Sequence, residues 1–172
     1  MTAATDIPAP GRSDPPAADG IHQSARKPAD PFNLDRFVRA QAGCFAAAVA
    51  ELEQGEKRTH WMWFIFPQML GLGKSANARL FAISSRDEAL AYCEHELLGP
   101  RLVQCTQAML AHAEGETAGD TSAIEILGVI DAMKFHSCMT LFDACCPSCD
   151  VYARALDTFF DGKRDAATLE KL

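Results

Sequence analysis

Two groups of polar side chains stand beside or within strongly apolar stretches and could do chemistry. The first surrounds an aromatic run and contains Lys57, His60, Trp61, Trp63 and Gln68. A histidine can act as acid, base or hydrogen-bond donor near neutral pH, and a tryptophan face can stack on a flat ring. An amide both donates and accepts. This group predicts a ligand-binding surface, with a packed core histidine and purely structural tryptophans as the alternative.

The second group follows helical spacing and contains Asp131, Lys134, Ser137 and Thr140. Residues three apart share one helix face, so this stripe could hold an anionic or hydroxylated ligand, with a Ser–Lys nucleophile pair as the most specific version. The alternative is structural: Asp131 caps the helix and pairs with Lys134, while Ser137 and Thr140 bond back to the preceding turn. If the chain is an enzyme, the catalytic candidates are His60, Lys134 and Asp131.

The seven cysteines offer a third possible site. Cys146 and Cys149 form a C-x-x-C pair, but there is no second such pair to complete a zinc site, and the redox motif belongs to α/β folds. We interpret both as incidental, oxidisable thiols. Cys44, Cys93 and Cys105 fall within helical patterns and are expected to be small, reduced core residues. The sequence indicates no metal site and no cofactor.

Composition places the chain in a broad class. It has 172 residues, 48% hydrophobic, with a formal net charge of −7. These values are ordinary for one globular domain, and the acidic balance argues against a nucleic-acid partner. No apolar run is long enough for a membrane span, and no secretory signal is visible. We therefore expect a cytoplasmic protein, whose oligomeric state the sequence does not specify.

The elements that must position these residues are helices. Residues 1–29 are rich in proline and predict a disordered tail. Residues 30–172 predict a compact all-α domain of about seven to nine helices, because three- and four-residue apolar spacing recurs and no alternating strand pattern does. The first helix follows a stripe from Leu34 to Leu52. A short helix is expected over His60–Phe66, with a buried strand as the competing interpretation.

Several polar residues predict helix starts. Asp30 or Asn33 can cap the first helix, Thr59 the aromatic one and Asp131 the helix Ala132–Cys145. The pair Ser85 and Glu88 has the spacing of a capping box. Further caps are expected at Ser75, Ser122 and Asp165. The acidic residues near Lys57 and Arg58, which are Glu51, Glu53 and Glu56, are interpreted as a solvated surface.

Two stretches resemble the signatures of a bacterial family, the domain of unknown function 1810, often labelled "calpastatin". They are Lys57-x-Thr59-His60-Trp61-Met62-Trp63-Phe64-Ile65-Phe66-Pro67-Gln68 and Asp131-x-x-Lys134-x-x-Ser137-x-Met139-Thr140-Leu141-Phe142. The similarity runs in unbroken order over residues 30–172. It implies an all-helical fold and no established activity. Cys138 stands where the family has a second serine after Ser137, which weakens any role for paired serines.

These observations leave two hypotheses. In the first, the chain is a small-molecule binding or hydrolytic domain. Its pocket lies between the 57–68 segment and the 131–142 helix, and its ligand is flat, polar and nucleotide-like. In the second, it is a non-catalytic structural or protein-interaction module, in which the same residues only brace the helices.

Overall fold

The computed structural model describes residues 30–113 and 121–172, and all the extended secondary-structure elements of these residues are helices. The tail predicted for residues 1–29 lies outside this part of the chain. The described part contains ten helices, against the seven to nine expected: α1 Asp35–Gln41, α2 Phe45–Glu53, α3 Met62–Ile65, α4 Ala76–Leu80, α5 Arg86–Glu94, α6 Leu98–Leu110, α7 Ala123–Leu127, α8 Val129–Cys145, α9 Val151–Phe160 and α10 Ala166–Leu169. The all-α class is thus confirmed.

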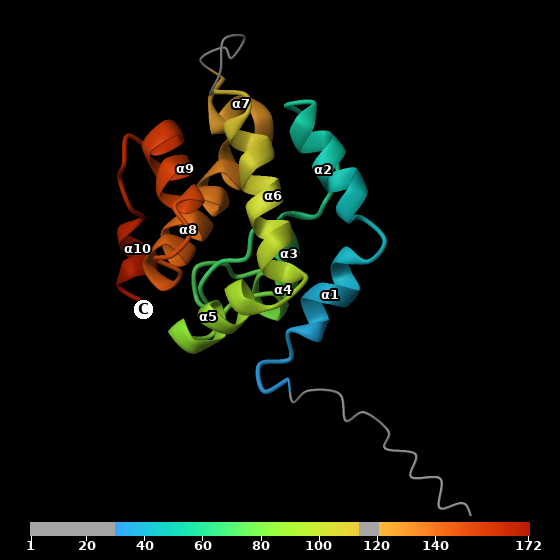
Figure 1. The fold of residues 1–172 in the computed structure, drawn as a ribbon, viewed down its shortest axis with the longest axis vertical. Coiled ribbons are helices and arrows are strands. Elements are labelled where there is room, and N and C mark those ends of the chain that lie inside the picture. Colours follow the sequence, from blue (N-terminus) through green and yellow to red (C-terminus); the bar gives the residue numbers. More distant parts are fainter. Residues whose placement is uncertain (1–29, 114–120) are drawn as a thin grey trace, which may run out of the picture.

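Helix α6 runs through the middle of the molecule, with α1 and α2 on one side and α8, α9 and α10 on the other (Figure 1). It packs against α2, α5, α9 and α3, while α8 packs against α5, α7, α9 and α10. Apolar faces of α6 and α8 are therefore covered from several directions. This arrangement removes most of the large side chains from water, which is the main source of stability in such a domain.

The aromatic run forms the short helix α3 and its flanks, as the helical interpretation predicts. Within the described residues there is no strand; the nearest approach to one is an isolated parallel bridge between Met69 and Ile83. Trp61 and Phe66 are fully buried, and the Phe66 ring lies 4.9 Å from the ring of Phe135 in α8. The aromatic segment is thus an interior element with α8 lying against it.

The single helix expected from Leu34 to Leu52 is wrong, because the structure has two helices in its place. A turn at residues 42–44 separates α1 from α2. The turn contains Gly43, and glycine costs about 1 kcal/mol in a helix interior. Both helices keep the expected apolar face, with Phe37 buried in α1 and Val49 and Leu52 buried in α2.

The predicted caps are partly confirmed. Asp30 accepts from the backbone N–H groups of Leu34 and Asp35. Ser75, Ser122 and Asp165 each accept from the third residue of their helix. Thr59 caps nothing, because its hydroxyl donates to a carboxylate instead. Only half of the Ser85 capping box forms: Ser85 accepts from the N–H of Glu88, but the Glu88 carboxylate turns to Ser84.

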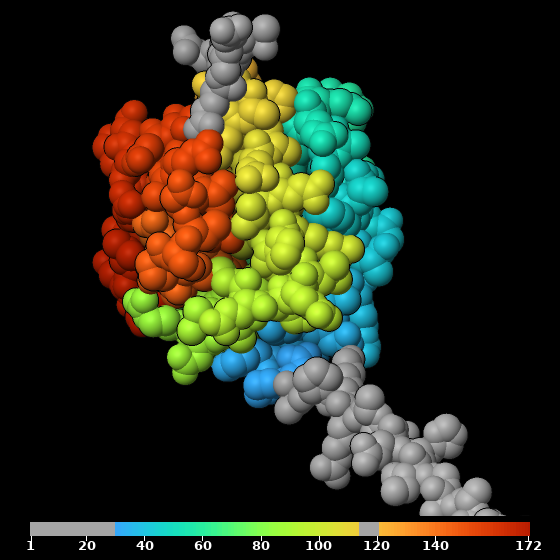
Figure 2. Space-filling view, in the orientation of Figure 1, coloured from blue at the N-terminus to red at the C-terminus, as the bar shows by residue number. Residues whose placement is uncertain are grey.

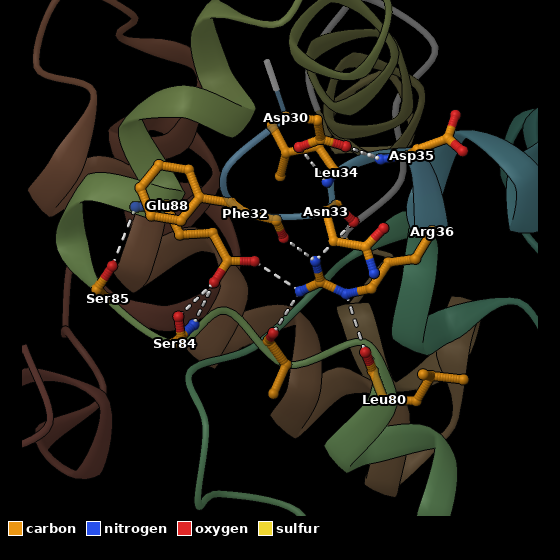
Figure 3. A network of polar contacts seen from close by, with 11 residues as sticks. Asp30, Phe32, Asn33, Leu34, Asp35, Arg36, Leu80, Ser84, Ser85 and Glu88 are labelled. Carbon is orange, nitrogen blue, oxygen red and sulfur yellow. Dashed lines mark hydrogen bonds and ion pairs between the residues drawn. The ribbon is translucent and has the colours of Figure 1, made fainter.

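Glu88 turns away from the box because it also pairs with Arg36 of α1, 2.6 Å away (Figure 3). The Arg36 guanidinium donates to this carboxylate and to four backbone carbonyls, those of Phe32, Asn33, Leu80 and Ala82. One arginine thus joins the start of α1, the end of α4 and the start of α5. Only the planar guanidinium, with five N–H donors, can make this set of contacts.

Candidate functional site

Two lysines distant in sequence share one carboxylate where the aromatic segment meets α8. The Lys57 ammonium lies 2.8 Å from Asp131 Oδ2, and the Lys134 ammonium lies 2.7 Å from Asp131 Oδ1. Their side chains are largely covered, with exposed fractions of 8% for Lys57, 17% for Asp131 and 21% for Lys134. We call Lys57, Asp131, Lys134 and the two tryptophans Trp61 and Trp63 the paired-lysine site.

The tryptophans complete this site. The Lys57 nitrogen lies 5.0 Å from the centre of the Trp61 ring, and the Lys134 nitrogen lies 4.8 Å from the centre of the Trp63 ring. A cation over an aromatic face is attracted by the ring quadrupole. Trp61 is buried, whereas Trp63 is half-buried. Each ammonium therefore has one aromatic face, and the Lys134–Trp63 pair is the one nearer to solvent.

Asp131 is not the helix cap that the sequence predicted. Helix α8 begins at Val129, two residues before Asp131, so Asp131 lies in its first turn. Burial raises the pKa of Asp131, but hydrogen bonds and charge from Lys134 and Lys57 outweigh burial and leave that pKa below its usual value. Asp131 is therefore ionised at neutral pH. With two ammonium groups around it, the cluster has a net charge of about +1.

The loop carrying Lys57 is held by Glu51, a residue that the sequence analysis placed on the surface. That interpretation is wrong, because Glu51 is buried. Its carboxylate accepts from the N–H groups of Arg58 and Thr59, the Thr59 hydroxyl and the indole N–H of Trp61. Burial raises the pKa of Glu51, but these four hydrogen bonds outweigh burial and lower the pKa to about 2. Glu51 thus fixes the position of the loop before α3.

Two signals in the sequence could have identified Glu51. It lies three residues after Ala48, which places it on the inner face of α2. A buried tryptophan also needs an acceptor for its N–H group. The first signal is easily missed, because Glu51 stands in one acidic group with Glu53 and Glu56, and these two side chains are indeed exposed.

The predicted site residues Ser137 and Thr140 have partners other than the two lysines. The Ser137 hydroxyl donates to Asp165 Oδ2 and to the carbonyl of Met133. The Thr140 hydroxyl accepts from the N–H of Asp165. Both therefore attach the start of α10 to α8. His60 is exposed on the loop before α3, and Gln68 is half-buried beside the Met69–Ile83 bridge.

Comparisons with known proteins agree with this fold. The family model "Protein of unknown function (DUF1810)" matches residues 31–172. The chain belongs to this family. It is also similar to the crystal structure of a conserved hypothetical protein from Mycobacterium tuberculosis, with 43% identity and a TM-score of 0.76 over 83% of this chain and 98% of that one. No curated protein matches it.

The cysteines of this DUF1810 chain are arranged differently from the expectation. Cys93 and Cys146 form a disulfide between α5 and the residue that ends α8. The interpretation of Cys93 as a reduced core residue is therefore wrong, and Cys146 is paired with it rather than with Cys149. Cys105 is buried and free, as expected, and Cys44 is half-buried and free.

Two further features of the DUF1810 chain concern its environment. None of the helices in residues 30–113 and 121–172 combines the length and apolarity needed to cross a bilayer. Within the same residues, no three His, Cys, Asp or Glu side chains converge as metal ligands would.

Proposed function

We propose that this chain is a small-molecule binding domain whose ligand combines an anionic group with a flat ring. The observation that carries the proposal is the imbalance of charge in the paired-lysine site. Two ammonium groups share one carboxylate, and among the described residues Asp131 is the one acid paired with either lysine. An anionic ligand oxygen would neutralise the remaining positive charge, which is costly to leave in a partly covered place.

Lys134 is the group best placed to receive that anion. Lys57 donates both to Asp131 and to the carbonyl of Thr59, and its side chain is nearly covered. Lys134 donates to Asp131, which is its one hydrogen-bond acceptor among the described residues, and its side chain is more exposed. An ammonium carries three N–H donors. Lys134 therefore keeps donors for a phosphate or carboxylate, while Lys57 holds Asp131 in place.

The surroundings of Lys134 suit a flat ring. Trp63 lies under its ammonium and is only half-buried. The neighbouring α8 residues Ile130 and Met133 are 71% and 67% exposed, although both are large and apolar. Exposed apolar side chains beside a charge are typical of binding surfaces. A nucleotide-like ligand matches this combination, with its phosphate on Lys134 and its ring on the apolar side chains.

Binding is better supported than hydrolysis through a Ser–Lys pair. Ser137 donates to Asp165 and to Met133, and Lys134 points to Asp131, so the two side chains have different partners. A serine nucleophile needs a base within hydrogen-bond distance. Of the catalytic candidates, Lys134 and Asp131 are paired with each other, and the exposed His60 lies on the same loop as Lys57.

The test is a calorimetric titration of the full chain with ADP and ADP-ribose as probes, supported by thermal shift. Lys134→Gln should reduce affinity for the bound probe at least tenfold while changing the melting temperature little. The matched control is Lys163→Gln, because Lys163 is an exposed lysine that also pairs with one aspartate. Equal affinities of Lys134→Gln and wild type, or no binding of either probe, would contradict the proposal.

A second candidate function, a protein-interaction module, is favoured by one observation. The start of α7 and the first turns of α8 carry exposed large apolar residues: Ile124, Val129, Ile130 and Met133. Such a patch can bind a protein. Met133→Asp distinguishes the two candidates. If this variant sediments differently from wild type but binds ADP and ADP-ribose equally well, the interaction module is favoured.

A further inference from the structure

A cavity of about 450 Å³ lies far in sequence from the aromatic run, where α5, α6 and the turn between α8 and α9 meet. Figure 2 shows the face of the molecule on which these three segments come together. The cavity is lined mainly by apolar, amide and sulfur-bearing side chains, including Leu90, Val103, Gln104 and Tyr152, and also by the acidic residue Glu94. Its most reactive groups are three cysteines.

These cysteines are Cys93, Cys146 and Cys149, and all three line the cavity. Cys93 and Cys146 are joined as a disulfide, while Cys149 is a free, half-buried thiol. A free thiol beside a disulfide is the arrangement that thiol–disulfide exchange requires, because a thiolate attacks one sulfur of the bond and the other sulfur leaves.

The turn after α8 brings Cys149 close to Cys146. The N–H of Cys149 donates to the carbonyl of Cys146 at 3.1 Å, which closes a turn of four residues. The end Cα atoms of such a turn lie within about 7 Å of each other. Disulfides bridge Cα atoms about 4.4–6.8 Å apart, and the Cα atoms of Cys93 and Cys146 are 6.7 Å apart. The turn therefore places Cys149 about as near to Cys146 along the backbone as Cys93 is.

We propose that this cavity is a thiol–disulfide exchange site, in which Cys149 displaces Cys93 from Cys146. Cys149 loses its proton to water, and its thiolate attacks the sulfur of Cys146. The Cys146–Cys149 bond forms as the Cys93–Cys146 bond breaks, and the electron pair leaves on Cys93, which takes a proton from water. One disulfide replaces another, so the step consumes no oxidant and no reductant.

The other free cysteines are poor competitors for this step. Burial raises the pKa of Cys105 to about 12, and it raises the pKa values of Cys138 and Cys145 as well. Their thiolates are therefore scarce at neutral pH. The fifth free thiol, Cys44, is outside the cavity lining. Exchange through Cys149 would remove the covalent link between α5 and the end of α8 and leave the Cys93 thiol at the cavity wall.

The experiment maps the cysteine pairing of the full, non-reduced chain. Wild-type protein is held at pH 8, quenched in acid to stop exchange, labelled with N-ethylmaleimide and analysed by peptide mass spectrometry. We expect a second population with Cys146 joined to Cys149 and the label on Cys93. Cys149→Ser should lose the Cys93 label completely, whereas the control Cys44→Ser should keep it. A label on Cys149 but never on Cys93 in wild type would overturn the proposal.

A second variant tests whether Cys146 and Cys149 can reach each other, and it does so even if the population with Cys146 joined to Cys149 is small in wild type. Cys93→Ser leaves Cys146 and Cys149 as the two thiols of the cavity, and oxidised glutathione is the probe. If the two thiols can reach each other, the chain should lose two hydrogens and retain no glutathione at either position. A stable glutathione adduct on Cys146 or Cys149, in a variant that still melts cooperatively, would also overturn the proposal.

Discussion

The ammonium of Lys57 lies 2.8 Å from the carboxylate of Asp131 and joins the loop before α3 to the first turn of α8. These residues lie in the two stretches that resemble the family signatures. Asp131 also holds Lys134. One carboxylate thus fixes the relative position of the aromatic segment and the helix packed against it.

Removing that carboxylate should leave two partly covered ammonium groups unpaired. We expect Asp131→Asn to lower the free energy of unfolding by about 2–3 kcal/mol, below the roughly 3–5 kcal/mol for a fully buried pair. Urea unfolding measures the change. The exposed ion-pair acid Asp161 provides the control, and Asp161→Asn should stay within about 0.5 kcal/mol. A double-mutant cycle with Lys57→Met should give a coupling energy well above zero.

Glu51 should make stability depend on acid pH. Its pKa is about 2 in the folded chain, below the ordinary value of 4.5. The stability that Glu51 contributes is therefore complete at pH values above its ordinary pKa of 4.5. It is lost as the pH falls from there toward the folded-state pKa of about 2. Glu51→Gln should cost about 1.5–3 kcal/mol at neutral pH and should flatten the pH dependence between those values. The control is Glu53→Gln on the exposed side of α2, and similar acid melting profiles for both variants would contradict this role.

Arg36 should not be replaceable by lysine. Lysine has three donors on one nitrogen and cannot reach four carbonyls and Glu88 together. Arg36→Lys should therefore lower the free energy of unfolding by about 2–4 kcal/mol, since buried acceptors lose their partners. Arg39→Lys is the matched control, because Arg39 is 79% exposed whereas Arg36 is 14% exposed. Thermal and urea unfolding of both variants measure the difference, and equal stabilities would refute the network's importance.

Gly99 should tolerate no side chain. A Cβ atom at this position would lie 2.1 Å from the carbonyl oxygen of Cys93, which belongs to the backbone of α5. Gly99→Ala should force α5 and α6 apart and cost about 1–3 kcal/mol or more. At Gly43, in contrast, no atom lies within 4 Å of the added Cβ. Gly43→Ala should be neutral or slightly stabilising in the same melting experiment, because alanine lowers the entropy of the unfolded chain.

The sequence predicts local features of this fold better than pairings between distant residues. Apolar spacing and caps such as Ser75 and Asp165 predict helices, because both depend on residues within one or two turns. Spacing predicts the pairing of Asp131 with Lys134, which lies one turn further along α8. The pairing of Asp131 with Lys57 and the partners of Arg36 depend on how whole helices dock, so spacing alone does not show them. The same holds for Ser137 and Thr140, whose stripe on α8 is correct but whose partner is the start of α10.

The disulfide between Cys93 and Cys146 should contribute strongly to stability, because the two residues are 53 positions apart. Cross-linking a loop of this length restricts the unfolded chain and stabilises the fold by about 2–4 kcal/mol. Reduction with dithiothreitol should lower the unfolding free energy by this amount, and Cys93→Ala should do nearly the same. A bridge between Cys146 and Cys149 would close a much shorter loop, so its formation in Cys93→Ala should not restore the lost stability. Cys44→Ala is the control, and reduced and oxidised chains of equal stability would show that the bridge does not form.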